Sequence, residues 1–114
     1  MLAKNTLILS LAAVASAQTF TGFTAGGISC GNGASATKAE VDAAMVGPKG
    51  SQREPRADNL ATAHCNKVTA PLFQVNVASK FVLQYAFDKA SNTYTFCGAS
   101  TVGTGKRTGC DPKK

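Results

Sequence analysis

The sequence predicts an α+β domain in which one helix packs on a central antiparallel sheet. Two patterns predict it: one capped helical segment near residue 40, and runs of alternating apolar and polar residues after residue 71. A helix followed by a series of strands is typical of α+β folds. The length of 114 residues allows one domain and excludes multidomain enzymes and repeat arrays.

The first seventeen residues have the pattern of a secretory signal peptide. Lys4 supplies a positive n-region, residues 6–14 an apolar h-region, and Ala15-Ser16-Ala17 a cleavage motif. The apolar stretch is too short to span a bilayer, so we expect a secreted, extracellular protein with no membrane association. The domain would then span Gln18 to Lys114, with eleven basic and six acidic residues.

A capping box predicts where the helix begins. Thr37 and Glu40 stand three residues apart, so each side chain can bind the backbone N–H of the other. We expect the helix to end at Gly47-Pro48, because glycine can take a left-handed conformation and proline cannot continue a helix. The expected apolar face consists of Val41, Ala44 and Met45. The preceding segment 19–33 predicts an edge strand or loop.

Strands are predicted in the second half of the chain. Residues 47–70 have no sustained period, and Lys49 to Asp58 predicts a solvated loop. After it, the expected strands are 72–77, 81–87 and 93–99, with a hairpin loop at 88–92 and a short last strand at 107–110. Alternation places Phe73, Val75 and Val77 on one face and Gln74, Asn76 and Gln84 on the other.

The four cysteines, Cys30, Cys65, Cys97 and Cys110, predict two disulfides, because their number is even and the leader indicates a secretory context. There is no C-x-x-C pair, and His64 is the only residue that could join the cysteines as a zinc ligand. We therefore disfavour a zinc site and expect no metal and no cofactor. The spacing leaves three connectivities open.

The chain lacks an evident acid–base pair. His64 is the only side chain that titrates near neutrality without help, and its place beside Cys65 is typical of a surface or structural histidine. Cleavage of RNA needs a base, an acid and a cation. The polar strand face instead carries the amides of Gln74, Asn76 and Gln84, which do not exchange protons at neutral pH.

Two further groups have alternative interpretations. The basic residues near the C-terminus form either a solvated tail or a phosphate-binding patch. They are Lys106, Arg107, Lys113 and Lys114. Tyr85, Tyr94 and Phe96 are expected in the core, and a base-stacking platform is the alternative.

The segment from Tyr94 to Gly105, followed by Gly109-Cys110, resembles the C-terminal end of the fungal guanyl-specific ribonucleases and ribotoxins. In that family a strand ends in an aliphatic-Thr-His-Thr-Gly run before a terminal cysteine. Ile28 to Gly31 is similar to the family's Tyr-x-Cys-Gly opening, and Pro55, Pro71 and Gln74 match by spacing. The resemblance covers most of residues 18–114 and implies the same α+β fold, with the bridges Cys30–Cys110 and Cys65–Cys97.

Carried over position by position, the resemblance implies a site without its catalytic groups. The family's catalytic Glu falls on Gln74, its transition-state Arg on Gln84, and its two His on Arg56 and Val102. The Tyr before the first His falls on Glu54. In the loop that binds guanine in the family, Asp58, Ala61 and Thr62 stand at the binding positions, and Asn59 alone is retained. The chain therefore resembles the inactive ribonuclease-like effectors of plant-infecting fungi, which bind host proteins or RNA and can enter host cells.

Three functions stay open. The leading hypothesis is a secreted, monomeric, non-catalytic effector that binds RNA, a ribosome or a host protein. Its expected contacts are Arg56, Asn59, Gln74, Asn76, Gln84, Lys106 and Arg107, with Lys113 and Lys114 as additions. The second is an active ribonuclease or ribotoxin that uses His64 with Glu54. The third is a protein-binding module or inhibitor that uses the loop from Gly47 to Ala63 and ignores RNA.

Overall fold

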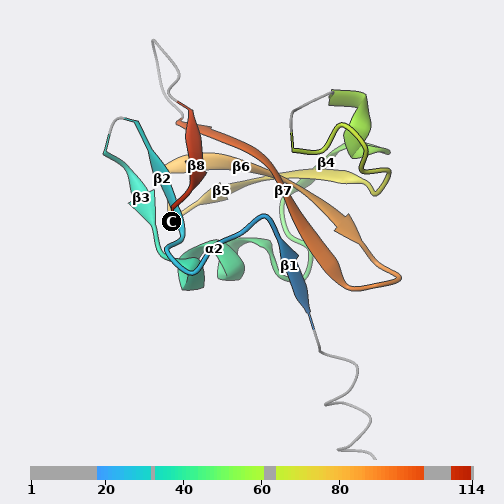
Figure 1. Cartoon of the computed structure of the whole chain (residues 1–114), viewed down its shortest axis with the longest axis horizontal. Helices are drawn as coiled ribbons and strands as arrows, with labels where there is room; N and C mark the ends of the chain where they lie inside the picture. Colours follow the sequence, from blue (N-terminus) through green and yellow to red (C-terminus); the bar gives the residue numbers. More distant parts are fainter. Residues whose placement is uncertain (1–17, 32, 61–63, 102–108, 114) are drawn as a thin grey trace, which may run out of the picture.

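The computed structural model describes residues 18–31, 33–60, 64–101 and 109–113. Within them lie one α-helix, α2 (Lys38–Met45), one 3-10 helix, η1 (Ala57–Leu60), and strands in two sheets (Figure 1). The larger sheet has the order β1-β7-β6-β5-β4 and the smaller the order β3-β2-β8. The strands are β1 (Thr19–Thr21), β2 (Ile28–Cys30), β3 (Ser35–Ala36), β4 (Ser51–Glu54), β5 (Leu72–Val77), β6 (Phe81–Asp88), β7 (Thr93–Thr101) and β8 (Cys110–Pro112). An α+β fold with a single helix is thereby confirmed.

The larger sheet is mixed rather than wholly antiparallel. β4, β5, β6 and β7 pair antiparallel, as expected, but β1 lies parallel to β7 at the edge. The Thr19 N–H donates to the carbonyl of Asn92 at 3.0 Å, so the chain enters the sheet beside the β6–β7 hairpin. From there it runs in the same direction as β7. The edge strand expected within 19–33 is therefore present, in an unexpected orientation.

The capping box begins α2 as predicted. The Glu40 N–H donates to the Thr37 hydroxyl at 3.1 Å, and the Thr37 N–H donates to Glu40 Oε1 at 2.9 Å. These bonds satisfy two of the four backbone donors that a helix start leaves open. The helix ends one step earlier than expected, because Val46 already has an extended conformation. Gly47 follows with φ of 129°, a conformation that L side chains rarely adopt.

The prediction of a solvated loop from Lys49 to Asp58 is wrong. Residues 51–54 form β4, which pairs with β5, and Ala57 is fully buried. The sequence concealed β4 because it is a polar, exposed edge strand without alternating apolar residues. β7 also continues to Thr101, and the last strand covers Cys110–Pro112 rather than the expected 107–110. Residues 107 and 108 lie outside the described residues.

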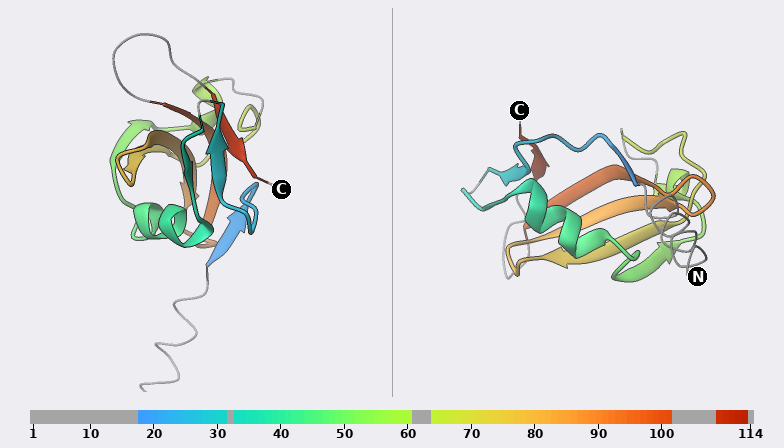
Figure 2. Two further views of the ribbon diagram at one scale, coloured as in Figure 1. Left: turned by 90° about the vertical axis from the view of Figure 1, so that its left-hand side faces the viewer. Right: turned by 90° about the horizontal axis from the view of Figure 1, so that it is seen from below.

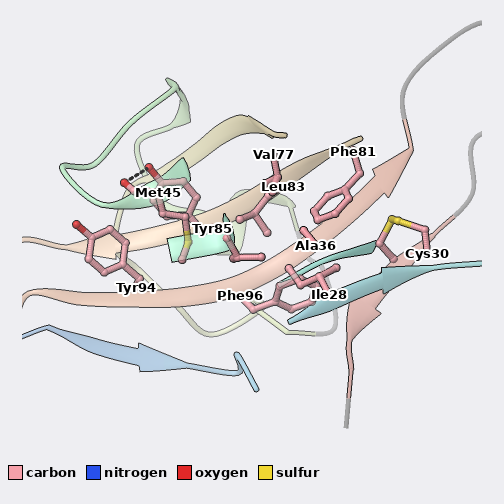
Figure 3. Close-up of a cluster of buried hydrophobic side chains, with 12 residues drawn as sticks. Ile28, Cys30, Ala36, Met45, Val77, Phe81, Leu83, Tyr85, Tyr94 and Phe96 are labelled. Carbon is pink, nitrogen blue, oxygen red and sulfur yellow. Dashed lines mark hydrogen bonds between the residues drawn. A yellow bond between two sulfur atoms is a disulfide. The ribbon is translucent and has the colours of Figure 1, made fainter. Parts of the chain in front are cut away.

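The main core lies between α2 and one face of the larger sheet (Figure 2). Val41 and Met45 of the helix pack with Tyr85, Tyr94 and Phe96 of the sheet, all 0–1% exposed. The Tyr85 hydroxyl lies within hydrogen-bonding distance of the backbone carbonyls of Met45 and Lys49, to which it can donate its one proton. This contact ties β6 to the end of the helix, and Figure 3 shows its Met45 side. The expected core role of the three aromatic residues is confirmed. A base-stacking platform made by them is excluded by their burial.

A second, smaller core covers part of the opposite face. Leu72, Ala86 and Cys97 of the sheet pack there against Ala57 and Cys65 of the 57–70 segment. The Cys65–Cys97 disulfide fixes that segment to β7, and Cys30–Cys110 joins two directly opposed residues of β2 and β8. These are the pairings that the family resemblance implied, so two disulfides are confirmed.

A β-bulge in β7 changes the alternation of that strand. Gln84 of β6 pairs with Gly98, but the next residue, Tyr85, pairs with Phe96. Cys97 therefore pairs with no residue of β6. As a result both Cys97 and Gly98 lie on the face opposite α2, and Ala99 returns to the main core. Bulges re-aim side chains in this way.

No helix among the described residues is long and apolar enough to cross a bilayer. The two disulfides are consistent with an extracellular, oxidising environment.

Removal of the two bridges is expected to destabilise the fold unequally. Cys30–Cys110 closes 80 residues of sequence and Cys65–Cys97 closes 32. On the chain-entropy model these loops correspond to about 4.5 and about 3.7 kcal/mol of unfolding free energy. Guanidinium unfolding of the two paired Cys→Ala variants, followed by circular dichroism because the chain has no Trp, compares them. An equal or reversed order contradicts this explanation.

Alkaline pH is expected to destabilise the protein through Tyr85. Two effects raise the pKa of Tyr85 above its ordinary value of 10: burial, which is the larger, and the neighbouring Tyr94. The folded state therefore keeps a proton that the unfolded state releases, so stability is full below pH 10 and falls as the pH rises above it. Tyr85→Phe is expected to cost about 1 kcal/mol at neutral pH through its lost hydrogen bonds. It should also flatten the alkaline fall of the thermal midpoint, and equal slopes in both proteins would contradict this assignment.

Candidate functional site

The second core covers only half of the sheet face opposite α2. The uncovered half carries a row of polar and small residues that crosses the strands. Ser51 pairs with Gln74, Gln74 with Gln84, and Gln84 with Gly98, so the row crosses β4, β5, β6 and β7. The next row consists of Asn76, Val82 and Ser100. We call these two rows the amide face. Gln74, Asn76 and Gln84 thus lie together, as the alternation of β5 and β6 predicted.

Gln74 and Gln84 are joined at the centre of this face. The Gln84 Nε2 donates to Gln74 Oε1 at 3.4 Å, and both side chains are half-buried. Each amide has more hydrogen-bonding groups than this one bond uses. Within the described part of the chain, the other groups of the two amides have no hydrogen-bond partner, so they are available to a bound molecule.

Three adjoining hollows surround Gln74, which lines all of them. The first, of about 310 Å³, is lined by Gln52, Arg53, Glu54, Leu72, Gln74 and Gln84. The second, of about 370 Å³, is lined by Gly50, Ser51, Arg53, Gln74, Val75 and Asn76. The third, of about 260 Å³, is lined by Gln74, Val82, Gln84, Gly98, Ala99 and Ser100. A chain-like ligand can therefore contact several hollows around one central amide.

Arg53 supplies the positive charge of the site. It stands at the bulge where β4 passes from its pair at Gln52 to its pair at Glu54, and it lines two of the hollows. Its side chain is exposed, and no acidic group among the described residues lies within ion-pair distance of it. Sequence analysis did not identify Arg53, because β4 was taken for a loop.

Arg56, which the sequence predicted as a phosphate contact, lies elsewhere. It lines none of the three hollows, and its guanidinium binds both carboxylate oxygens of Asp58, at 3.1 and 2.7 Å. The hydrogen bond from Arg56 holds the pKa of the Asp58 carboxyl below its ordinary value. Asn59, the other expected contact, donates to Glu54 Oε1 at 3.3 Å and so orients a carboxylate at the rim of the first hollow.

The structure does not bring His64 to this site. His64 is exposed and packs edge-on against Phe96, with ring centroids 5.0 Å apart, and it lines none of the three hollows. Of the described residues that line them, Glu54 alone carries a carboxylate. The His64–Glu54 pair of the ribonuclease hypothesis is therefore not assembled there.

Several expected site residues lie outside the described residues: Ala61, Thr62, Val102, Lys106, Arg107 and Lys114. Lys113 is described, exposed, and held by its backbone N–H to the carbonyl of Gly27 at 2.7 Å. Among the residues that the structure covers, no group of three His, Cys, Asp or Glu is placed to hold a metal ion.

An apolar hollow of about 720 Å³ lies on the other side of the molecule, beside the end of α2. The eight residues of α2 extend about 12 Å, whereas the eight residues of β6 extend about 26 Å. The helix therefore leaves part of the sheet uncovered, where Phe73 and Phe87 are only partly buried. Pro48, Thr69, Ala70, Pro71, Asp88, Lys89 and Ala90 complete the lining.

Comparison of the chain with protein-family models, with curated proteins and with solved structures found no match in any of the three. The likeness to fungal ribonucleases is therefore carried by the motifs in the sequence alone.

Proposed function

We propose that this protein is a secreted, non-catalytic, ribonuclease-like domain that binds single-stranded RNA on its amide face. The observation that carries the proposal is the pair of joined amides, Gln74 and Gln84, beside the unpaired cation of Arg53. At the two central positions where the resembling ribonucleases carry charged catalytic groups, this chain carries neutral hydrogen-bonding groups.

The chemistry of the face supports binding rather than cleavage. Attack by a 2′-hydroxyl requires one group that takes a proton and another that gives one. In the part of the chain that the structure covers, Glu54 is the single residue of that kind lining the hollows. Amides and a guanidinium, by contrast, bind phosphates and bases without proton transfer.

The charge of the protein supports a polyanionic ligand. The formal net charge of the full chain is +6 at pH 7, and residues 18–114 keep eleven basic against six acidic residues. Lys38, Arg56 and Lys80 have acidic neighbours within 4.0 Å, whereas Arg53 on the amide face has none among the residues that the structure describes. A phosphate at Arg53 therefore does not compete with an internal ion pair.

Salt-dependent RNA binding without cleavage is the expected result for the oxidised protein secreted from a eukaryotic expression host. Fluorescence anisotropy with a short labelled single-stranded RNA, between about 50 and about 200 mM salt, measures the affinity and its salt slope. Arg53→Gln is expected to lower the slope by about 0.7, the value of one phosphate contact to a single strand. The same samples, run on a denaturing gel, are expected to contain intact RNA.

Lys89→Gln is the matched control, because it removes the same charge from the rim of the apolar hollow. Equal losses in both variants would show that net charge alone attracts RNA and would contradict a site at the amide face. Cleavage that His64→Ala abolishes would establish the ribonuclease hypothesis instead. Absence of both binding and cleavage would favour the protein-binding hypothesis.

A further inference from the structure

Gly98 occupies an unusual place for a glycine, the interior of β7, a strand that is paired on both sides. Glycine weakens a strand interior, because it has no side chain to pack and loses more conformational entropy on folding than other residues. Its position opposite Gln84 in the amide face therefore needs a reason.

Gly98 adjoins the β-bulge at Cys97, but neither its φ nor a close contact requires a glycine there. Gly98 does not have a positive φ, and an added Cβ would meet only Gln84 Oε1, at 3.6 Å, an ordinary contact distance. Gly27 and Gly50 differ, because a Cβ there would lie 2.0 and 2.2 Å from backbone oxygens. Those two glycines are required by the fold, whereas Gly98 is not.

What the missing side chain provides is open space over the amides. Gly98 forms part of the 260 Å³ hollow, with Gln74, Val82 and Gln84 among the other lining residues. This volume is below the roughly 300–1,000 Å³ of pockets that enclose a whole small-molecule ligand. The hollow therefore suits a single small group at the end of a larger ligand.

The lining defines the chemistry of that group. None of the described residues that line the hollow carries a charge, so they offer hydrogen bonds rather than an ion pair to a phosphate. Gln84 Oε1 offers an acceptor above Gly98, and Gln74 Nε2 offers donors that the Gln74–Gln84 bond does not use. A neighbouring donor and acceptor match the edge of a planar nucleobase, which carries the same two kinds of group side by side.

We infer that the hollow above Gly98 is a nucleobase site, in which one base of a bound RNA strand lies against Gly98 with its edge on the Gln74–Gln84 pair. The adjacent phosphate lies in the neighbouring hollow at Arg53, because Gln74 lines both. This inference rests on the proposed function. It adds that the amide face binds an RNA strand with bases more tightly than a ribose-phosphate strand without them.

The test compares a short single-stranded RNA with an abasic ribose-phosphate strand of the same length. The wild-type protein is expected to bind the RNA on the order of tenfold more tightly, the effect of one or two neutral hydrogen bonds. Gly98→Ala should remove most of that difference, because the methyl group stands beside Gln84 Oε1, where the base would lie. The salt slope should not change, because Arg53 is untouched.

Gly98→Ala is also expected to raise the thermal midpoint, since alanine suits a strand better than glycine. A variant that is more stable but binds RNA more weakly cannot be explained by misfolding. Gly109→Ala is the matched control, because a Cβ there meets nothing within 4 Å. Gln84→Met, which keeps the volume but removes the amide, should reproduce the loss.

Equal affinity of the wild-type protein for the RNA and the abasic strand would overturn the base site but leave salt-dependent RNA binding intact. Unchanged discrimination in Gly98→Ala would also overturn it. Absence of binding to either strand would overturn the base site together with the proposed function.

Discussion

The arrangement of the amide face depends on the bulge at Cys97. With regular alternation, Gly98 would point toward the main core with Phe96, and Ala99 would lie on the opposite face. Cys97 faces Cys65 in either case, but the extra residue reverses the order after it, so Gly98 joins the row of Gln74 and Gln84. The face opposite α2 therefore has a half that is covered and fixed by a disulfide and, directly after the bulge, a half that is open. The main core is undisturbed, because Tyr94 and Phe96 precede the bulge.

The sequence predicts well those elements that have a local capping motif or an alternation of apolar and polar side chains. The capping box of Thr37 and Glu40 is local and needs no tertiary context, and the alternation in 72–77 and 81–87 follows directly from burial of one face. β4 was missed because its residues are exposed, so no apolar period marks it. The parallel pairing of β1 was missed because the orientation of a short edge strand depends on where the chain enters the sheet.

The site was predicted in part for the same reasons. Gln74, Asn76 and Gln84 were placed on one face because strand period alone determines it. Arg53 was missed with β4, and Arg56 was chosen without its bidentate partner Asp58, which the residue spacing does not reveal. Gly98 was not recognised because a bulge changes which face a residue occupies. A glycine within a strand pattern is nevertheless a signal of a bulge or of close approach by another group.

The disulfides also determine what a cut in the chain can do. Cys30–Cys110 encloses Cys65–Cys97 in the sequence, so a peptide bond broken anywhere between residues 30 and 110 leaves both fragments joined. A protease that nicks a surface loop would thus open the chain without releasing a piece of it. After one such cut the molecule would stay one covalent particle, and a reducing agent would be needed to separate its two parts.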